Sequence, residues 1–269
     1  MNNELSPINY TTLEIERNYK VSTIWLNRPD VRNAFNEVMI AELINAFKEE
    51  GKRADTRAIV LRGRGKVFCA GADLNWMRDV AQYGYEQNYK ESLQLATCFH
   101  TIYTCPKPTL AIVHGAAMGG ANGLLAACDF AFCEADTIFS LSEVKIGIIP
   151  ACISPYIIKR IGEYPSRELM LTGQRIHGRD AEHLKLVNRC FSDIHATEAH
   201  LQATLQLLLT SGPQAISHCK KLIDTVANKI SMTEALDYTA KMIAEIRASA
   251  EGQEGMAAFL EKRKPNWIE

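Results

Sequence analysis

Short apolar segments that favour β-strands alternate with helical segments over roughly the first 190 residues of the chain. TLEIERNYKVSTIWLN, residues 12–27, predicts two strands joined by a turn, and AIVLRG, TLAIVHG, DFAFCEA and TIFSL predict four further strands. Asn36 is the predicted N-cap of an amphipathic helix that continues to Glu50. Strands that alternate with helices in this way indicate parallel sheet layers with crossover helices. The expected fold class is therefore α/β.

The sequence pattern is helical almost throughout from Ser154 onward, with glycine and proline marking the breaks between helices. We therefore divide the chain into an α/β core, residues 1–190, and a helical C-terminal region, residues 191–269. The second part is too small and too amphipathic to be an independent domain. We expect it to pack on the core or on a neighbouring subunit.

The composition is that of an ordinary globular protein, with 269 residues, 47% hydrophobic residues and a net charge of −1. Scattered Lys and Arg residues give no electrostatic case for nucleic acid or a membrane as a partner. The first ten residues, MNNELSPINY, lack the features of a signal peptide or presequence, so we expect a cytoplasmic protein. The eight cysteines form no CxxC pair, which favours free thiols over disulfides or zinc and predicts no metal site.

Two segments share one design, in which a strand leads into a glycine-containing turn that opens a helix. They are VFCAGAD, residues 67–73, and HGAAMGGA, residues 114–121. Glycine lets a ligand approach the main chain, and N–H groups from two such turns could form an oxyanion hole. Tight packing of a helix against a sheet explains either turn alone equally well.

Four blocks in order resemble the enoyl-CoA hydratase/isomerase (crotonase) superfamily. They are LNRPDVRNAFN, FCAGADL, HGAAMGGANGLLAACD and FSLSEVKIGIIP, and the C-terminal FLEKRKPNW is similar to that family's ending. The resemblance extends from about Leu13 to Trp267. It implies a crotonase (ClpP-like) spiral of βαβ units with a helical C-terminal region, assembled as a trimer or a pair of trimers.

The resemblance also implies an acyl-CoA substrate whose thioester oxygen lies between the backbone N–H groups of Ala72 and Gly120. Coenzyme A is then part of the substrate, and no separate cofactor is expected. By motif position, the substrate- and CoA-binding residues are Arg32, Ala70, Asp73, Leu74, Gly119, Phe259 and Lys262, the last two reaching CoA from a neighbouring subunit. Solvated surface charges are the alternative interpretation of Arg32 and Lys262.

Hydratases of this superfamily usually use two glutamates, and only one is present here. Glu143, in SLSEVKIG, matches the residue that exchanges a proton with the α-carbon, and its apolar flanks are expected to raise its pKa. Gly123 occupies the position of the water-activating glutamate. We expect Asp129, at the end of the same segment, to have a structural role.

The pairing of GGANGL with LSEVKIGIIPACISPYIIKRIG resembles bacterial methylglutaconyl-CoA hydratases and their carboxygeranoyl-CoA relatives, whose substrates are branched and carry a distal carboxylate. On this basis Gly123 would leave room for that carboxylate or avoid repelling it. Ser154 and Tyr156 are candidates to bind it, although Ser154 could instead be an N-cap. The alternatives are a Δ3,Δ2-enoyl-CoA isomerase with one glutamate, and a non-catalytic acyl-CoA-binding protein.

Overall fold

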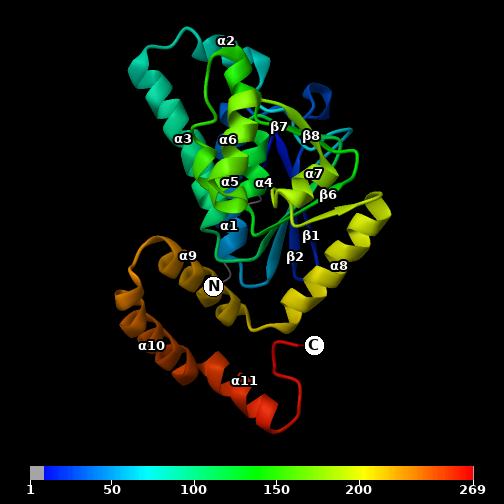
Figure 1. Cartoon of the computed structure of the whole chain (residues 1–269). Helices are drawn as coiled ribbons and strands as arrows, with labels where there is room; N and C mark the ends of the chain where they lie inside the picture. The colour runs from blue at the N-terminus through cyan, green and yellow to red at the C-terminus, as the bar shows by residue number, and fades with distance from the viewer. Residues whose placement is uncertain (1–8, 269) are drawn as a thin grey trace.

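The computed structural model describes residues 9–268, and its centre is a six-stranded sheet (Figure 1). Across this sheet the order is β1 (Leu13–Asn18), β2 (Val21–Leu26), β3 (Ala58–Gly63), β4 (Thr109–Val113), β6 (Phe130–Glu134) and β9 (Arg189–Phe191). The β1–β2 hairpin is antiparallel, and every other neighbouring pair in this sheet is parallel. The α/β class with a parallel sheet is confirmed.

A second, smaller sheet is formed by β5 (Ala116–Met118), β7 (Ile138–Ser140) and β8 (Arg175–His177). The chain passes directly from β4 into β5, turning at Gly115, whose φ of 63° favours glycine. β8 and β9 fall in a stretch that the sequence pattern predicted to be largely helical. Each has only three residues, which is too short for an alternation of apolar and polar residues to be recognised in the sequence. Pairing to a neighbouring strand holds each of them in place.

Helices cover both faces of the large sheet. One side carries α1 (Glu37–Lys52), α3 (Tyr85–Tyr103), α4 (Ala121–Ala127) and α5 (Ser154–Ile161), which pack on one another in that order. α8 (Ile194–Thr210) covers the other side, where its Leu201 and Leu205 bury Val60 and Ile112. Residues of β3 and β4 alternate between these two cores, as expected for buried parallel strands. The shorter helices are α2 (Leu74–Val80), α6 (Glu163–Thr172) and α7 (Gly178–His183).

Of the two residues considered as helix N-caps from the sequence, one caps its helix and the other does not. Asn36 caps α1 as predicted, since its side chain accepts a hydrogen bond from the N–H of Met39 at 3.1 Å. Ser154 is not an N-cap: it is the first residue of α5, and its hydroxyl donates to the carbonyl of Ala151.

The last three helices stand away from the sheet, at the bottom of Figure 1: α9 (Pro213–Asn228), α10 (Met232–Ala248) and α11 (Ala250–Leu260). They contact mainly one another. Lys220 ties α9 to the core by an ion pair of 2.6 Å with Asp129, whose carboxylate also accepts from the N–H of Thr109. Asp129 is thus structural, as expected. None of the helices in residues 9–268 is long and apolar enough to cross a membrane.

Candidate active site

The two glycine-containing turns predicted from sequence lie side by side and are hydrogen-bonded to each other. Cys69 N–H donates to the carbonyl of Ala116, and Met118 N–H donates to the carbonyl of Cys69, both at 3.1 Å. Gly71 has a φ of 94°, and a Cβ there would lie 2.7 Å from the carbonyl oxygen of Met118. Only glycine allows this approach, which brings the chain around residue 72 against the chain around residue 119.

Ala72 and Gly120 are both partly exposed, and neither N–H donates a hydrogen bond to any of residues 9–268. Phe35 adjoins both residues. Its backbone forms a bridge with Ala72, and its ring reaches within 2.6 Å of the point where a Cβ of Gly120 would lie. Two free N–H groups that both adjoin one residue would stabilise a negative oxygen lying within reach of both. Sequence reasoning missed Phe35, because a buried phenylalanine after a turn is usually a core residue.

The Glu143 carboxylate lies against the same glycine turn. It is carried by a 3₁₀ turn, Ser142–Ile146, that follows β7, and its Oε1 would be 3.3 Å from a Cβ on Gly119. Its Oε2 is buried and has no hydrogen-bond partner among the described residues. Burial raises the pKa of Glu143, as the apolar flanks predicted. A half-buried carboxyl with one unpartnered oxygen, beside free N–H groups, is suited to move protons.

The position of the second glutamate is filled rather than vacant. A Cβ on Gly123 would overlap Cγ2 of Ile153 and lie 2.8 Å from Cε1 of Phe99. Both of these side chains are themselves buried. The expectation that Gly123 leaves room for a substrate carboxylate is therefore wrong: the space belongs to the core.

Four of the predicted CoA-binding residues gather beside Ala72. Ala70 N–H donates to the carbonyl of Arg32 at 2.9 Å, so these two residues adjoin, and the Arg32 side chain is exposed. The Asp73 carboxylate is buried, pairs with Arg28 at 2.9 Å, and caps α2 through the N–H groups of residues 75 and 76. Hydrogen bonds to that helix end and to Arg28 outweigh burial and lower the pKa of Asp73. Leu74, by contrast, is 69% exposed.

Phe259 and Lys262 do not join this group within one chain. α11, which ends one residue after Phe259, lies at the bottom of Figure 1, whereas α2 lies at the top. The Phe259 side chain is 83% exposed. Tyr156, a candidate to bind a substrate carboxylate, is instead buried and packs against the rings of Phe99 and Tyr103.

The chain is similar over nearly its whole length to known proteins. A family model described as enoyl-CoA hydratase/isomerase matches residues 16–269. The crystal structure of an enoyl-CoA hydratase from Shewanella pealeana has a TM-score of 0.92 and 39% identity over 96% of each chain. Pseudomonas aeruginosa AtuE has a TM-score of 0.92 and 36% identity, covering 96% of this chain and 100% of its own. Enoyl-CoA hydratase ACTT6 of Alternaria alternata is 33% identical over 88% of this chain and 77% of its own. The crotonase fold expected from the four sequence blocks is thereby confirmed, and the chain belongs to the enoyl-CoA hydratase/isomerase family.

Proposed function

We propose that this protein hydrates a 2-enoyl-CoA thioester, with the thioester oxygen between the N–H groups of Ala72 and Gly120. The observation that carries the proposal is the Glu143 carboxylate, whose Oε2 is buried without a partner, against the glycine that precedes Gly120. Family membership supports enoyl-CoA hydration in general. The proposed reaction needs no group besides this chain, water and the CoA thioester.

In the proposed reaction Glu143 serves both as base and as acid. Its carboxylate takes a proton from water as the water oxygen bonds to the β-carbon. The π electrons move to the thioester oxygen, and the resulting enolate is held by the two N–H groups. The Glu143 carboxyl then returns its proton to the α-carbon, so the product carries the whole water molecule.

As substrate we propose a branched enoyl-CoA with a distal carboxylate, such as 3-methylglutaconyl-CoA. The pairing of GGANGL with LSEVKIGIIPACISPYIIKRIG supports this, as does the absence of an acid at position 123, since a second carboxylate near the site would repel the substrate's own. The filled space around Gly123 means that the carboxylate binds elsewhere in the site.

A comparison of 3-methylglutaconyl-CoA with crotonyl-CoA tests this specificity. We expect kcat/KM to be at least about tenfold higher for the branched substrate, equivalent to about 1.4 kcal/mol of barrier. Hydration is followed by the loss of the enoyl absorbance and by a product heavier by one water. Equal kcat/KM values for the two thioesters would contradict the proposed substrate.

Isomerisation of a Δ3-enoyl-CoA is a second candidate, because Phe99 and Ile153 leave a single carboxylate at the glycine turn. One carboxylate suffices to carry a proton from the α-carbon to the γ-carbon. The product would then have the mass of the substrate. Binding of acyl-CoA without any turnover would instead indicate the non-catalytic alternative.

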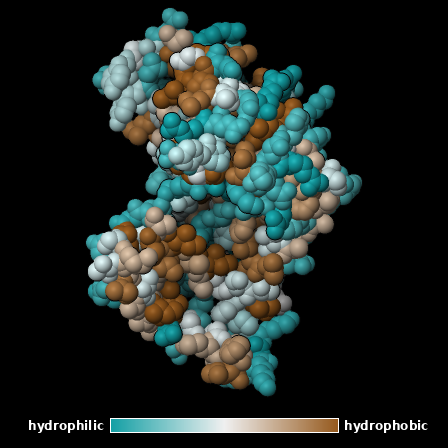
Figure 2. Space-filling view, viewed as in Figure 1, coloured by the Kyte–Doolittle hydropathy of each residue, from teal (hydrophilic) through white to brown (hydrophobic). Residues whose placement is uncertain are grey.

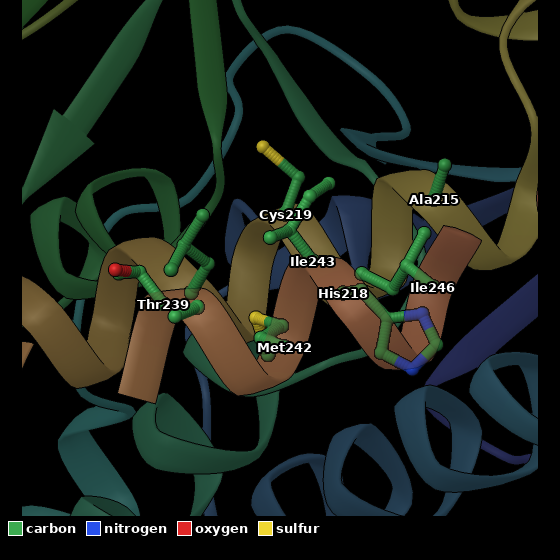
Figure 3. Close-up of a pocket in the computed structure, with 9 residues that line it drawn as sticks. Ala215, His218, Cys219, Thr239, Met242, Ile243 and Ile246 are labelled. Atoms are coloured by element: carbon green, nitrogen blue, oxygen red, sulfur yellow. The ribbon is translucent and has the colours of Figure 1, made fainter. Parts of the chain in front are cut away.

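We also propose that the helical C-terminal region contacts further copies of the chain. Its outer side chains include Leu236 and Leu260, which are 72% and 78% exposed, and Figure 2 shows hydrophobic atoms gathered over α9 and α10. An apolar groove of about 420 Å³ runs between these two helices (Figure 3). Exposed apolar surface of this kind is typical of a protein interface. A neighbour's α11 would also bring Phe259 and Lys262 to the site that they do not reach within one chain.

Light scattering in solution tests this assembly. We expect a mass of three or six times the 30.0 kDa of one chain. Leu236→Asp is expected to shift the protein toward smaller species, because it would place a charge in the proposed contact between copies. A single species of 30.0 kDa for the unaltered protein would contradict the proposal.

A further inference from the structure

The Asn122 side chain is fully buried in the first turn of α4 and is surrounded by carbonyl groups. Its Nδ2 donates to the carbonyl oxygens of Ala117 at 3.1 Å, Gly119 at 2.9 Å and Ser140 at 3.0 Å. These three acceptors belong to β5, to the glycine turn and to the end of β7. One amide therefore joins three separate segments.

The orientation of this amide is fixed. Rotating it by half a turn would place Oδ1 against three carbonyl oxygens, which would repel it. In the observed orientation Oδ1 is buried without a partner, and the only other such side-chain atom in residues 9–268 is Oε2 of Glu143. The two N–H groups of the amide are thus shared among three carbonyls while its own oxygen stays unsatisfied, which is unfavourable by itself.

The three segments are those that carry the proposed active site. Gly119 N–H also donates to the carbonyl of Ser140, at 2.8 Å, and Gly119 immediately precedes Gly120. Glu143 follows Ser140 by three residues, and its carboxylate rests on Gly119. The amide of Asn122 is therefore hydrogen-bonded to the backbone segments that carry the Gly120 N–H donor and the Glu143 acid.

We propose that Asn122 is a positioning residue, which fixes the spacing between the Gly120 N–H and the Glu143 carboxylate. This rests on the proposed function, in which both groups act on one thioester. A displacement of about 1 Å between groups that must act together can lower a rate by about 10²-fold. Asn122 itself does not touch the substrate, because it is fully buried.

A series of substitutions removes the donors stepwise. Asn122→Ser keeps one donor, Asn122→Ala keeps none, and Asn122→Asp replaces the donors with a carboxylate that the three carbonyls repel. We expect kcat to fall in that order, reaching about 10²-fold for Asn122→Ala, with KM changed less than about threefold. The matched control is Thr197→Val, in α8, which removes an equally buried hydroxyl that donates to the carbonyl of Asp193, the N-cap of that helix.

A spectroscopic measurement separates positioning from stability. The infrared carbonyl stretch of bound butyryl-CoA, an unreactive saturated thioester, reports the hydrogen bonds to the thioester oxygen. We expect a band shifted to lower frequency in the unaltered protein and in Thr197→Val, and a smaller shift in Asn122→Ala, all measured below the unfolding transition. Asn122→Ser provides the same comparison if Asn122→Ala does not fold.

Two results would overturn the proposal. One is an unchanged band and kcat in the folded Asn122 variants. The other is a loss of kcat that Thr197→Val reproduces at equal destabilisation. A shifted band without any turnover of enoyl-CoA by the unaltered protein would instead overturn the proposed hydration alone, because the band of the variants would still decide the role of Asn122.

Discussion

Replacing Glu143 with glutamine is expected to lower kcat by about 10²–10⁴-fold while leaving CoA affinity nearly unchanged. Glutamine has almost the same shape but cannot carry a proton between water and the α-carbon. Single-turnover assays with an enoyl-CoA measure the first effect, and calorimetric titration with a saturated acyl-CoA measures the second. Glu134→Gln is the matched control, because burial also raises the pKa of Glu134, on β6. Retained turnover in Glu143→Gln would remove Glu143 from its proposed role.

The unaltered protein and Glu143→Gln should differ in how their kcat and their stability depend on pH. Since the reaction begins with the Glu143 carboxylate, kcat of the unaltered protein should fall as the pH is lowered through the raised pKa of Glu143. The folded state holds this proton more tightly than the unfolded state. The associated stability is therefore fully present below the unfolded pKa and is lost as the pH rises through the folded pKa. Glu143→Gln stays neutral, so it should unfold at a higher temperature than the unaltered protein at pH 7, with the difference shrinking in acid.

Introducing a side chain at Gly123 is expected to destabilise the fold rather than restore a second catalytic acid. A Cβ there overlaps Ile153 and crowds Phe99, and both side chains are buried. Overpacking of this kind typically costs about 1–3 kcal/mol. Gly123→Ala should therefore lower the thermal midpoint by several degrees, and Gly123→Glu should do so more severely without any gain in hydration.

A double-mutant cycle and a matched glycine check this explanation. Ile153→Ala removes the overlapping methyl group, so the combined Gly123→Ala/Ile153→Ala protein should lose less stability than the sum of the single variants. Gly84→Ala is the control, because a Cβ on Gly84 would meet nothing within 4 Å. Strictly additive losses in the cycle, or a stable Gly123→Glu protein with higher activity, would contradict the packing argument.

The sequence by itself determined the elements that rest on local chemistry. Short stretches of sequence were enough to predict the apolar strands with their glycine turns, the Asn36 cap and the apolar surroundings of Glu143. Each of these depends on residues that are neighbours in the chain. The family resemblance extended this to the whole fold.

Only the tertiary structure decided which of these segments contact one another. Sequence windows do not reveal that Ile153 and Phe99 fill the space at Gly123, nor that Asn122 joins three segments, since these contacts link distant parts of the chain. Asp73 was predicted from its motif to contact CoA, and its carboxylate is engaged by Arg28 and by the start of α2. The physical reason is the same in each case: burial and hydrogen bonding depend on what packs against a residue, and long-range packing leaves no period in the local sequence.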